Sequence, residues 1–179
     1  YEAVQAYADK VEVVIQRTGP NKLDMVKDVG DVPYLPMLAP DMAKFTELAT
    51  EDEKFEAAVR QACMFVRYCE KKGFTAVELL GRESGNVEYA LKNREVAYEA
   101  VRRLKSGVNI QGQDELYRPS IPMFIGSMAS LEDIDNAIAK GADGGIMGRP
   151  NSTMAKYSME KDYAFLACGT LDNPAPGRD

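Results

Sequence analysis

The sequence has 179 residues, of which 45% are hydrophobic and 28% charged, which is enough chain to bury a core in one globular domain or two small ones. The net charge of −6 disfavours a nucleic acid or an anionic membrane surface as the main partner, because both require a basic face. The absence of histidine excludes Ser-His-Asp and Cys-His nucleophile systems, and three cysteines without a Cys-x-x-Cys pair predict no bound metal. No apolar run reaches about 18 residues, so no membrane insertion is expected.

Hydrophobic periodicity and capping residues predict a mostly α-helical chain with little sheet. The expected helices span about residues 1–17, 41–48, 51–72, 86–105, 130–140 and 159–167. Residues 20–40 carry four prolines and are expected to form an extended connection. Thr50 with Glu53, and Ser130 with Asp133, have the spacing of helix-capping pairs. The only expected strands are residues 121–125 and 144–147.

Two stretches of the sequence resemble each other. Residues 32–37, Val-Pro-Tyr-Leu-Pro-Met, align without a gap with residues 118–123, Arg-Pro-Ser-Ile-Pro-Met, and a Met-Ala pair follows each at the same distance. The word Tyr-Glu-Ala-Val precedes both, at residues 1–4 and 98–101. This order predicts two related helix–loop–helix segments, 1–97 and 98–179, joined by long extended connections or merged into one compact unit. A coincidence of common helix words is the alternative.

The helix expected at residues 51–72 carries two of the three cysteines. Its apolar stripe consists of Phe55, Val59, Ala62, Val66 and Cys69. Cys69 is therefore expected to face the core as a small buried hydrophobe. Cys63 lies at the edge of the stripe, with Arg60 three residues before it and Arg67 four residues after it. A partly exposed thiol between two guanidiniums is expected to have a lowered pKa and to be able to attach a ligand. An incidental boundary cysteine is the alternative.

The third cysteine, Cys168, follows an aromatic stretch that contains Tyr163 and Phe165. An aromatic wall beside a thiol suits a flat ligand, and it suits a core cysteine equally well.

A different pattern occupies residues 121–149. The segment Ile-Pro-Met-Phe-Ile-Gly at 121–126, the helix that follows it, and Gly-Ala-Asp-Gly-Gly-Ile-Met-Gly-Arg at 141–149 resemble the closing strands of phosphate-binding (β/α)₈ barrels. Glycine at a strand end lets backbone amides approach a phosphate, so Gly126, Gly148 and Arg149 would hold one. The resemblance covers about 30 residues, and a complete barrel takes about 250 residues. A glycine-rich turn after a helix is the alternative.

The duplicated helix–loop pattern, the proline-containing connections, the tyrosines and the cysteines beside arginines together resemble the gamma subunits of red-algal phycoerythrin. The resemblance implies a non-catalytic light-harvesting linker that carries phycobilins, phycoerythrobilin or phycourobilin, thioether-linked to cysteines. The attachment sites would be Cys63 and Cys168, with Cys69 as a further candidate, and Arg60 and Arg67 would pair with bilin propionates. It further implies phycobiliprotein α/β hexamers and other linkers as partners, and a chloroplast location on the stromal side of the thylakoid.

Two other functions stay open at this stage. One is a phosphate-binding (β/α)-barrel-like enzyme, or a fragment of one, acting on a phosphorylated metabolite or flavin. The other is a colourless helical interaction protein without a small ligand.

Overall fold

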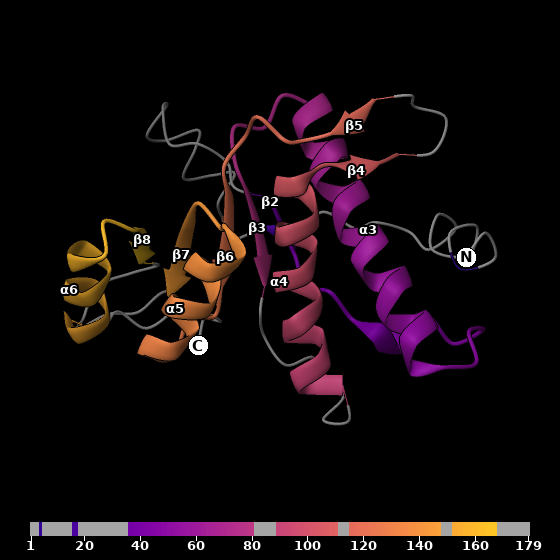
Figure 1. Cartoon of the computed structure of the whole chain (residues 1–179), viewed down its shortest axis with the longest axis horizontal. Helices are drawn as coiled ribbons and strands as arrows, with labels where there is room; N and C mark the ends of the chain where they lie inside the picture. Colours follow the sequence, from indigo (N-terminus) through magenta and orange to yellow (C-terminus); the bar gives the residue numbers. More distant parts are fainter. Residues whose placement is uncertain are drawn as a thin grey trace.

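The computed structural model describes residues 4, 16–17, 36–80, 89–110, 115–147 and 152–167. These residues form a six-stranded sheet, a short hairpin and helices that lie beside the sheet (Figure 1). The strands of the large sheet are β1 (Gln16–Arg17), β2 (Pro36–Leu38), β3 (Val77–Leu80), β6 (Met123–Gly126), β7 (Gly144–Met147) and β8 (Ala164–Ala167). The hairpin consists of β4 (Val108–Asn109) and β5 (Leu116–Tyr117). The helices are the 3-10 helix η1 (Met42–Lys44) and the α-helices α3 (Glu51–Lys71), α4 (Ala90–Ser106), α5 (Leu131–Lys140) and α6 (Ser152–Glu160).

The order of the strands in space follows their order in the chain. The sheet runs β1-β2-β3-β6-β7-β8, and every pair from β2 to β8 is parallel, while β1 is antiparallel to β2. Right-handed crossovers that all step in one direction place their helices on one face of the sheet. A doubly wound sheet would reverse its strand order at a switch point, so this winding is the one found in (β/α) barrels.

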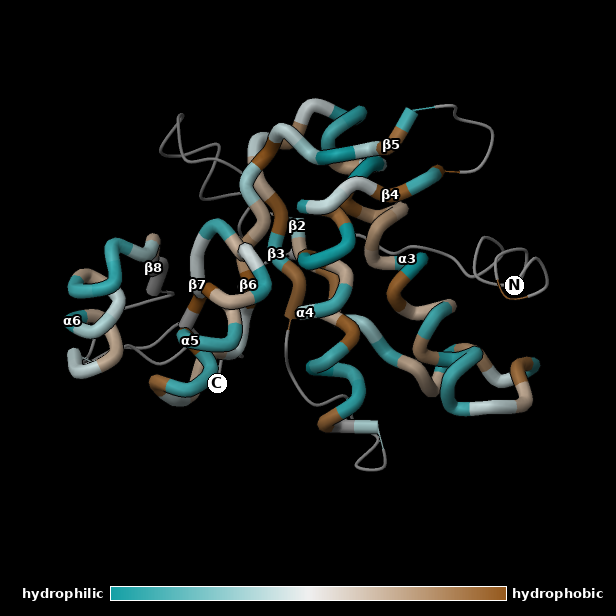
Figure 2. The backbone as a smooth tube through the Cα atoms, viewed as in Figure 1, coloured by the Kyte–Doolittle hydropathy of each residue, from teal (hydrophilic) through white to brown (hydrophobic). Residues whose placement is uncertain are grey.

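One face of the sheet packs against the helices. Val77 and Leu79 of β3 and Met123 and Ile125 of β6 are at most 1% exposed and belong to one cluster of buried side chains. The four α-helices contribute to the same cluster, for example with Val66, Val101, Ile134 and Met154. Figure 2 shows β3 as a hydrophobic strand behind α4. Burying one side chain such as Leu79 contributes about 1.5–3 kcal/mol, so this cluster dominates the stability of the fold.

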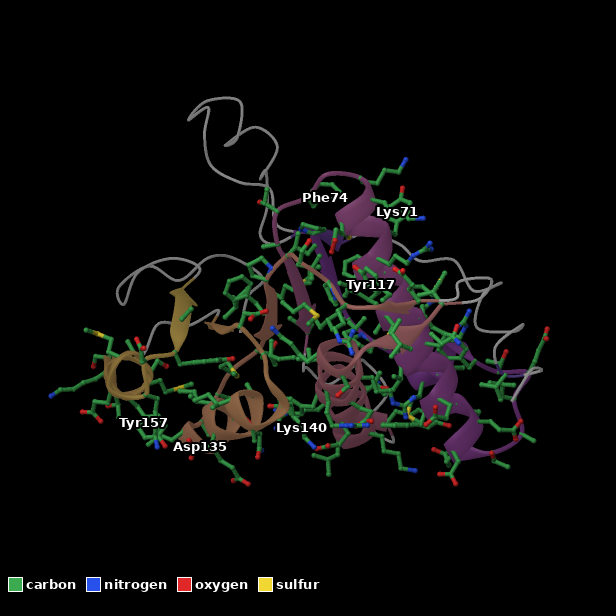
Figure 3. The ribbon with its side chains drawn as sticks, turned by 45° about the horizontal axis from the view of Figure 1, so that its top comes forward. Lys71, Phe74, Tyr117, Asp135, Lys140 and Tyr157 are labelled. Atoms are coloured by element: carbon green, nitrogen blue, oxygen red, sulfur yellow. The ribbon has the colours of Figure 1, made fainter. Side chains whose placement is uncertain are left out.

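Side chains also join neighbouring helices and loops. Tyr157 of α6 donates from its hydroxyl to Asp135 Oδ1 of α5 at 2.6 Å, and the two residues lie beside each other in Figure 3. Tyr117 of the hairpin donates to Glu70 Oε1 of α3 at 3.2 Å. Together with the core these contacts hold the helices in chain order along the sheet.

The predicted helix caps are confirmed. Thr50 Oγ1 accepts the backbone N–H of Glu53 at 3.1 Å and begins α3. Ser130 and Asp133 form a complete capping box at the start of α5. Gly141 ends α5 with a φ of 88°, a left-handed conformation that favours glycine. The two expected strands are confirmed as β6 and β7.

The expectation of a mostly α-helical chain with little sheet is wrong. The described residues form an α/β fold whose centre is the parallel sheet. Strand β3 was missed because all four of its residues are buried, so it lacks the polar–apolar alternation of a half-buried strand. The helix expected at 159–167 is also wrong, because α6 ends at Glu160 and the chain continues as β8. Asp162, with a φ of 53°, turns the chain between them.

The two similar stretches contain strands β2 and β6 of the same sheet. The continuation after each strand differs, because η1 follows β2 after three residues, whereas the ten-residue helix α5 follows β6 after four. The expected boundary between residues 97 and 98 lies inside α4, and the parallel sheet continues across it from β3 to β6. Of the first Tyr-Glu-Ala-Val word, only Val4 is among the described residues.

Candidate functional site

The carboxyl ends of the parallel strands share one edge of the sheet, which we call the carboxyl edge. Strands β2, β3 and β6 end there at Leu38, Leu80 and Gly126, and the first turns of α3, α4 and α5 follow from it. In parallel α/β proteins this edge carries the loops that bind ligands. A functional site is therefore expected at this edge.

The face of the sheet turned away from the helices, called the inner face here, carries a continuous row of residues. Register pairs join Met37 to Glu78, Glu78 to Phe124, Phe124 to Gly144, and Gly144 to Ala164. Successive side chains of a strand point to opposite faces of the sheet. Because Val77 and Leu79 face the helices, Glu78 and Leu80 lie on the inner face. Consistently, Leu80 lies outside the buried cluster that the helices form.

Glu78 is the only carboxylate among the fully buried side chains of the described residues, with 0% exposure. Its register partner on β6 is Phe124, and its side chain reaches Gly126, the partner of Leu80, where an added Cβ would lie 2.8 Å from Glu78 Oε2 and 2.8 Å from Leu80 Cδ1. The glycine therefore leaves the room that the carboxylate occupies. A Val or Leu is usual at such a position in a parallel sheet, and a buried charge is costly unless it is compensated.

The loop after β6 has an unusual backbone. Ser127 follows Gly126 directly and adopts a φ of 59°, which is uncommon for a residue other than glycine. Backbone strain of this kind collects at functional sites, where the surrounding structure holds it in place. Ser127 thus directly follows the glycine that the Glu78 side chain reaches.

The side chain of Asn93 ties the loop after β2 to α4. Asn93 is fully buried, its Oδ1 accepts the backbone N–H of Met42 at 2.8 Å, and its Nδ2 donates to Asp41 Oδ1 at 3.3 Å. Asp41 Oδ1 also accepts the N–H of Ala43 at 2.9 Å. The bonds of Asn93 span 51 and 52 residues of sequence, so they fix the loop after β2 against the first turn of α4.

Asp133 fixes the loop after β6. Its Oδ2 accepts the backbone N–H groups of Ala129 at 2.8 Å and Ser130 at 3.1 Å, and its Oδ1 faces Arg94 Nη1 at 3.4 Å. A groove between the first turns of α4 and α5 is lined by both Arg94 and Asp133. The carboxylate occupies two amides just before α5, and Ser130 Oγ accepts the N–H of Asp133 itself. This part of the predicted phosphate site is therefore not favoured, and the carboxylate of Glu78 beside Gly126 disfavours an anion there too.

A third polar group joins α3 to α4 at the same edge. Tyr89 donates its hydroxyl to Glu51 Oε1 at 3.0 Å and accepts from Lys54 Nζ at 3.1 Å. Lys92 Nζ lies 3.0 Å from Glu51 Oε2. Lys92 is the main cause that lowers the pKa of Glu51. The start of α4 thus contacts the start of α3 through charged side chains.

The expected partial exposure of Cys63 is wrong. Cys63 is 2% exposed, and burial raises the pKa of its thiol to about 12, although Arg103 and Arg60 act in the opposite direction. Arg60 does line the same small cavity as Cys63, between α3, α4 and β4. The sequence could not show that α4 covers the thiol and brings Arg103, which is paired with Glu56 at 2.6 Å, to that cavity.

The other predicted site residues are distributed over the molecule. Cys69 is 0% exposed, as expected for a core residue, and burial raises the pKa of its thiol to about 12. Arg67 lies near Tyr117. Burial and Glu70 raise the pKa of the Tyr117 hydroxyl, and Arg67 acts in the opposite direction. Cys168, Gly148 and Arg149 lie outside the described residues. Asn93 and Glu78 were missed, although a lone polar residue in an apolar strand such as Val-Glu-Leu-Leu was a visible signal.

No family model, no curated protein and no solved structure matches this chain. Within the described ranges, no helix is long and apolar enough to cross a membrane. The same part of the chain contains no group of three or more His, Cys, Asp or Glu side chains placed to hold a metal ion.

Proposed function

We propose that this chain forms part of a (β/α)-barrel-type enzyme that acts on a phosphorylated small molecule at the carboxyl edge of its sheet. The observation that carries the proposal is the buried carboxylate of Glu78 on the inner face, with Gly126 beside it. In barrels of this winding, catalytic residues come from the carboxyl ends of the strands, and Glu78 lies two residues before the end of β3. Glu78 would act there as an acid–base or hydrogen-bonding group.

The phosphate group is assigned to the segment after β7. Gly148 and Arg149 follow the last residue of β7 in the sequence, and α6 begins at Ser152. Backbone amides beside a glycine, a guanidinium and a helix start are the groups that hold phosphates. The start of α5 is the less suitable place, because the Asp133 carboxylate already accepts the amides of Ala129 and Ser130 just before it.

The proposal differs from the expected bilin-carrying linker. No finding bears directly on bilin binding, on phycobiliprotein partners or on a chloroplast location, so these stay predictions. The parallel sheet does not favour a mostly helical linker, and the burial of Cys63 and Cys69 does not favour covalent attachment at either thiol. Cys168, which lies outside the described residues, remains the predicted attachment site under that hypothesis.

A binding experiment tests the proposed function. The melting temperature of the purified chain is measured with inorganic phosphate, a sugar phosphate and a nucleotide, each against chloride at equal ionic strength. At least one phosphate compound should raise the melting temperature in a saturable way. Arg149→Ala should remove this response. Lys71→Ala also removes one positive charge, but at the last residue of α3, away from the carboxyl edge, and should keep the response.

Glu78→Gln separates binding from chemistry. The variant should still respond to the phosphate compound, because the proposed role of Glu78 is chemical. Turnover of any substrate found among phosphorylated metabolites should be lost. No stabilisation of the wild-type chain by any of the three phosphate compounds would overturn the proposal.

A further inference from the structure

We propose that the first turn of α4 positions the loops of the carboxyl edge relative to one another, with Asn93 as the central positioning residue. The proposal rests on the proposed function only for its consequence on ligand binding. The positioning itself follows from contacts that the first turn of α4 makes on both of its sides.

The first step is the burial of Asn93. A fully buried amide costs free energy unless both its oxygen and its nitrogen are hydrogen-bonded, and an apolar side chain would fill this core position without that requirement. Asn93 meets the requirement by bonding to the loop after β2, at Met42 N and Asp41 Oδ1. Met42 itself is 0% exposed, so the amide holds the loop where it enters the core.

The second step is the neighbouring residue. Arg94 contacts Asp133, and the other oxygen of that carboxylate accepts the amides of Ala129 and Ser130 in the loop after β6. Consecutive residues of α4 therefore reach the loops of two different strands. The ion pair is about one-third exposed on the arginine side and is the weaker connection.

The third step concerns the helix itself. Lys92 and Tyr89 attach the start of α4 to Glu51 at the start of α3. A shift of the first turn of α4 would therefore disturb three neighbours at one edge, while the sheet below it keeps its backbone pairing. Loops that carry ligand-binding groups need such support to hold their geometry.

Amide hydrogen exchange tests the proposal on the whole chain, read at Met42, Ala129 and Ser130, with the amides of β3 and β6 as internal references. Asn93→Leu should lower protection at Met42 by at least about tenfold, the equivalent of about 1.4 kcal/mol for a lost buried hydrogen bond. Protection at Ala129 and Ser130 should fall as well, and β3 and β6 should keep theirs. The control Arg102→Gln, at an exposed position in the second half of α4, should change neither loop.

Asn93→Asp keeps the proposal testable if Asn93→Leu does not fold. The new carboxylate can still accept from Met42, but its second oxygen faces Asp41, so two negative charges meet at neutral pH. Protection factors in both loops should be low at pH 7 and should rise as the pH is lowered, because a proton shared by the two carboxyls replaces the donor that Asn93 Nδ2 supplies. Wild-type protection at pH 7 in this variant, or a loss confined to Met42, would contradict the positioning role.

Binding of the phosphate compounds by the wild-type chain and by Asn93→Leu separates the two proposals. If the wild-type chain binds a phosphate compound and Asn93→Leu binds it equally well, the positioning proposal is overturned and the proposed function stands. If the wild-type chain binds none, the proposed function fails, and the exchange pattern in the two loops still decides the role of Asn93. A uniform loss of protection that includes β3 and β6 would mean that Asn93 only stabilises the fold, and would also overturn the positioning proposal.

Discussion

Glu78 and Gly126 occupy adjacent strands so closely that a single methyl group on the glycine would stand 2.8 Å from the carboxylate oxygen. This contact links the buried carboxyl group of Glu78 to the strand end where Ser127 has its left-handed backbone. The space beside Gly126 is therefore filled by the Glu78 carboxylate and is not a void.

Gly126→Ala should destabilise the protein, because the buried side chains of Glu78 and Leu80 must both move away from the new methyl group. A loss of about 1–3 kcal/mol in the free energy of unfolding is expected from such overpacking. Urea denaturation of Gly126→Ala, Glu78→Ala and the double variant forms a cycle with the wild type. A coupling of about 0.5–3 kcal/mol is expected, with Glu78→Ala relieving part of the loss. Strictly additive effects would show that the two positions do not contact each other.

Cys63 and Cys69 should react slowly with a thiol reagent in the folded protein. Burial raises the pKa of both thiols to about 12, so the thiolate fraction at pH 8 is very small. The test uses a Cys168→Ser variant and an aromatic disulfide reagent that releases a coloured thiolate for each protein thiol it modifies. Absorbance should show almost no thiolate release from the native variant, and release equivalent to two thiols once denaturant is added. Rapid release from the native protein would contradict the described burial.

The same two thiols predict a loss of stability at alkaline pH. Their folded pKa of about 12 lies above the ordinary thiol value of 9.0. Their stabilising effect is therefore fully present below pH 9 and is lost as the pH rises from 9 towards 12. The midpoint of urea unfolding should fall over this range, and Cys63→Ala should make the fall less steep. An unchanged slope in that variant would remove Cys63 from the explanation.

Glu99 predicts an acid-sensitive contribution. The Arg102 guanidinium, with Arg103 adding to it, holds the pKa of Glu99 at about 2 against the opposing effect of burial. Because this pKa lies below the ordinary value of 4.5, the stabilisation is present above pH 4.5 and is lost as the pH falls towards 2. Glu99→Gln should flatten the fall in melting temperature across that interval, whereas Glu132→Gln, on an exposed part of α5, serves as the charge-matched control.

Asp133→Asn should weaken the start of α5 and the loop before it. The amide can present only one acceptor oxygen, so it cannot receive Ala129 and Ser130 and face Arg94 as a charge. A cost of about 1–2 kcal/mol is expected, comparable to the loss of a strong helix cap. Thermal unfolding measures this cost, and Ser130→Ala, which removes only one bond of the capping box, should cost less. Equal effects of the two substitutions would argue against the role of Asp133 beyond the cap.

Local sequence determined the features that depend on neighbouring residues. Thr50 and Ser130 define helix starts through bonds to residues three positions away, and Gly141 ends α5 through its own backbone conformation. Strands β6 and β7 were visible because glycine and apolar residues surround them. The fold class was not, because β3 is buried on both faces and shows no alternation.

The tertiary structure decided the features that depend on distant contacts. Asn93 finds its partners 51 and 52 residues away, and Glu78 meets Gly126 only because β3 and β6 are neighbours in the sheet. Helix phase placed Cys63 at the edge of an apolar stripe, but packing of α4 against α3 decides whether that edge meets solvent. Burial then raises the pKa of the Cys63 thiol more than Arg103 and Arg60 lower it. Removing the thiolate charge from water costs more than the attraction of these two partly exposed guanidiniums returns. Arg103 is in addition paired with Glu56.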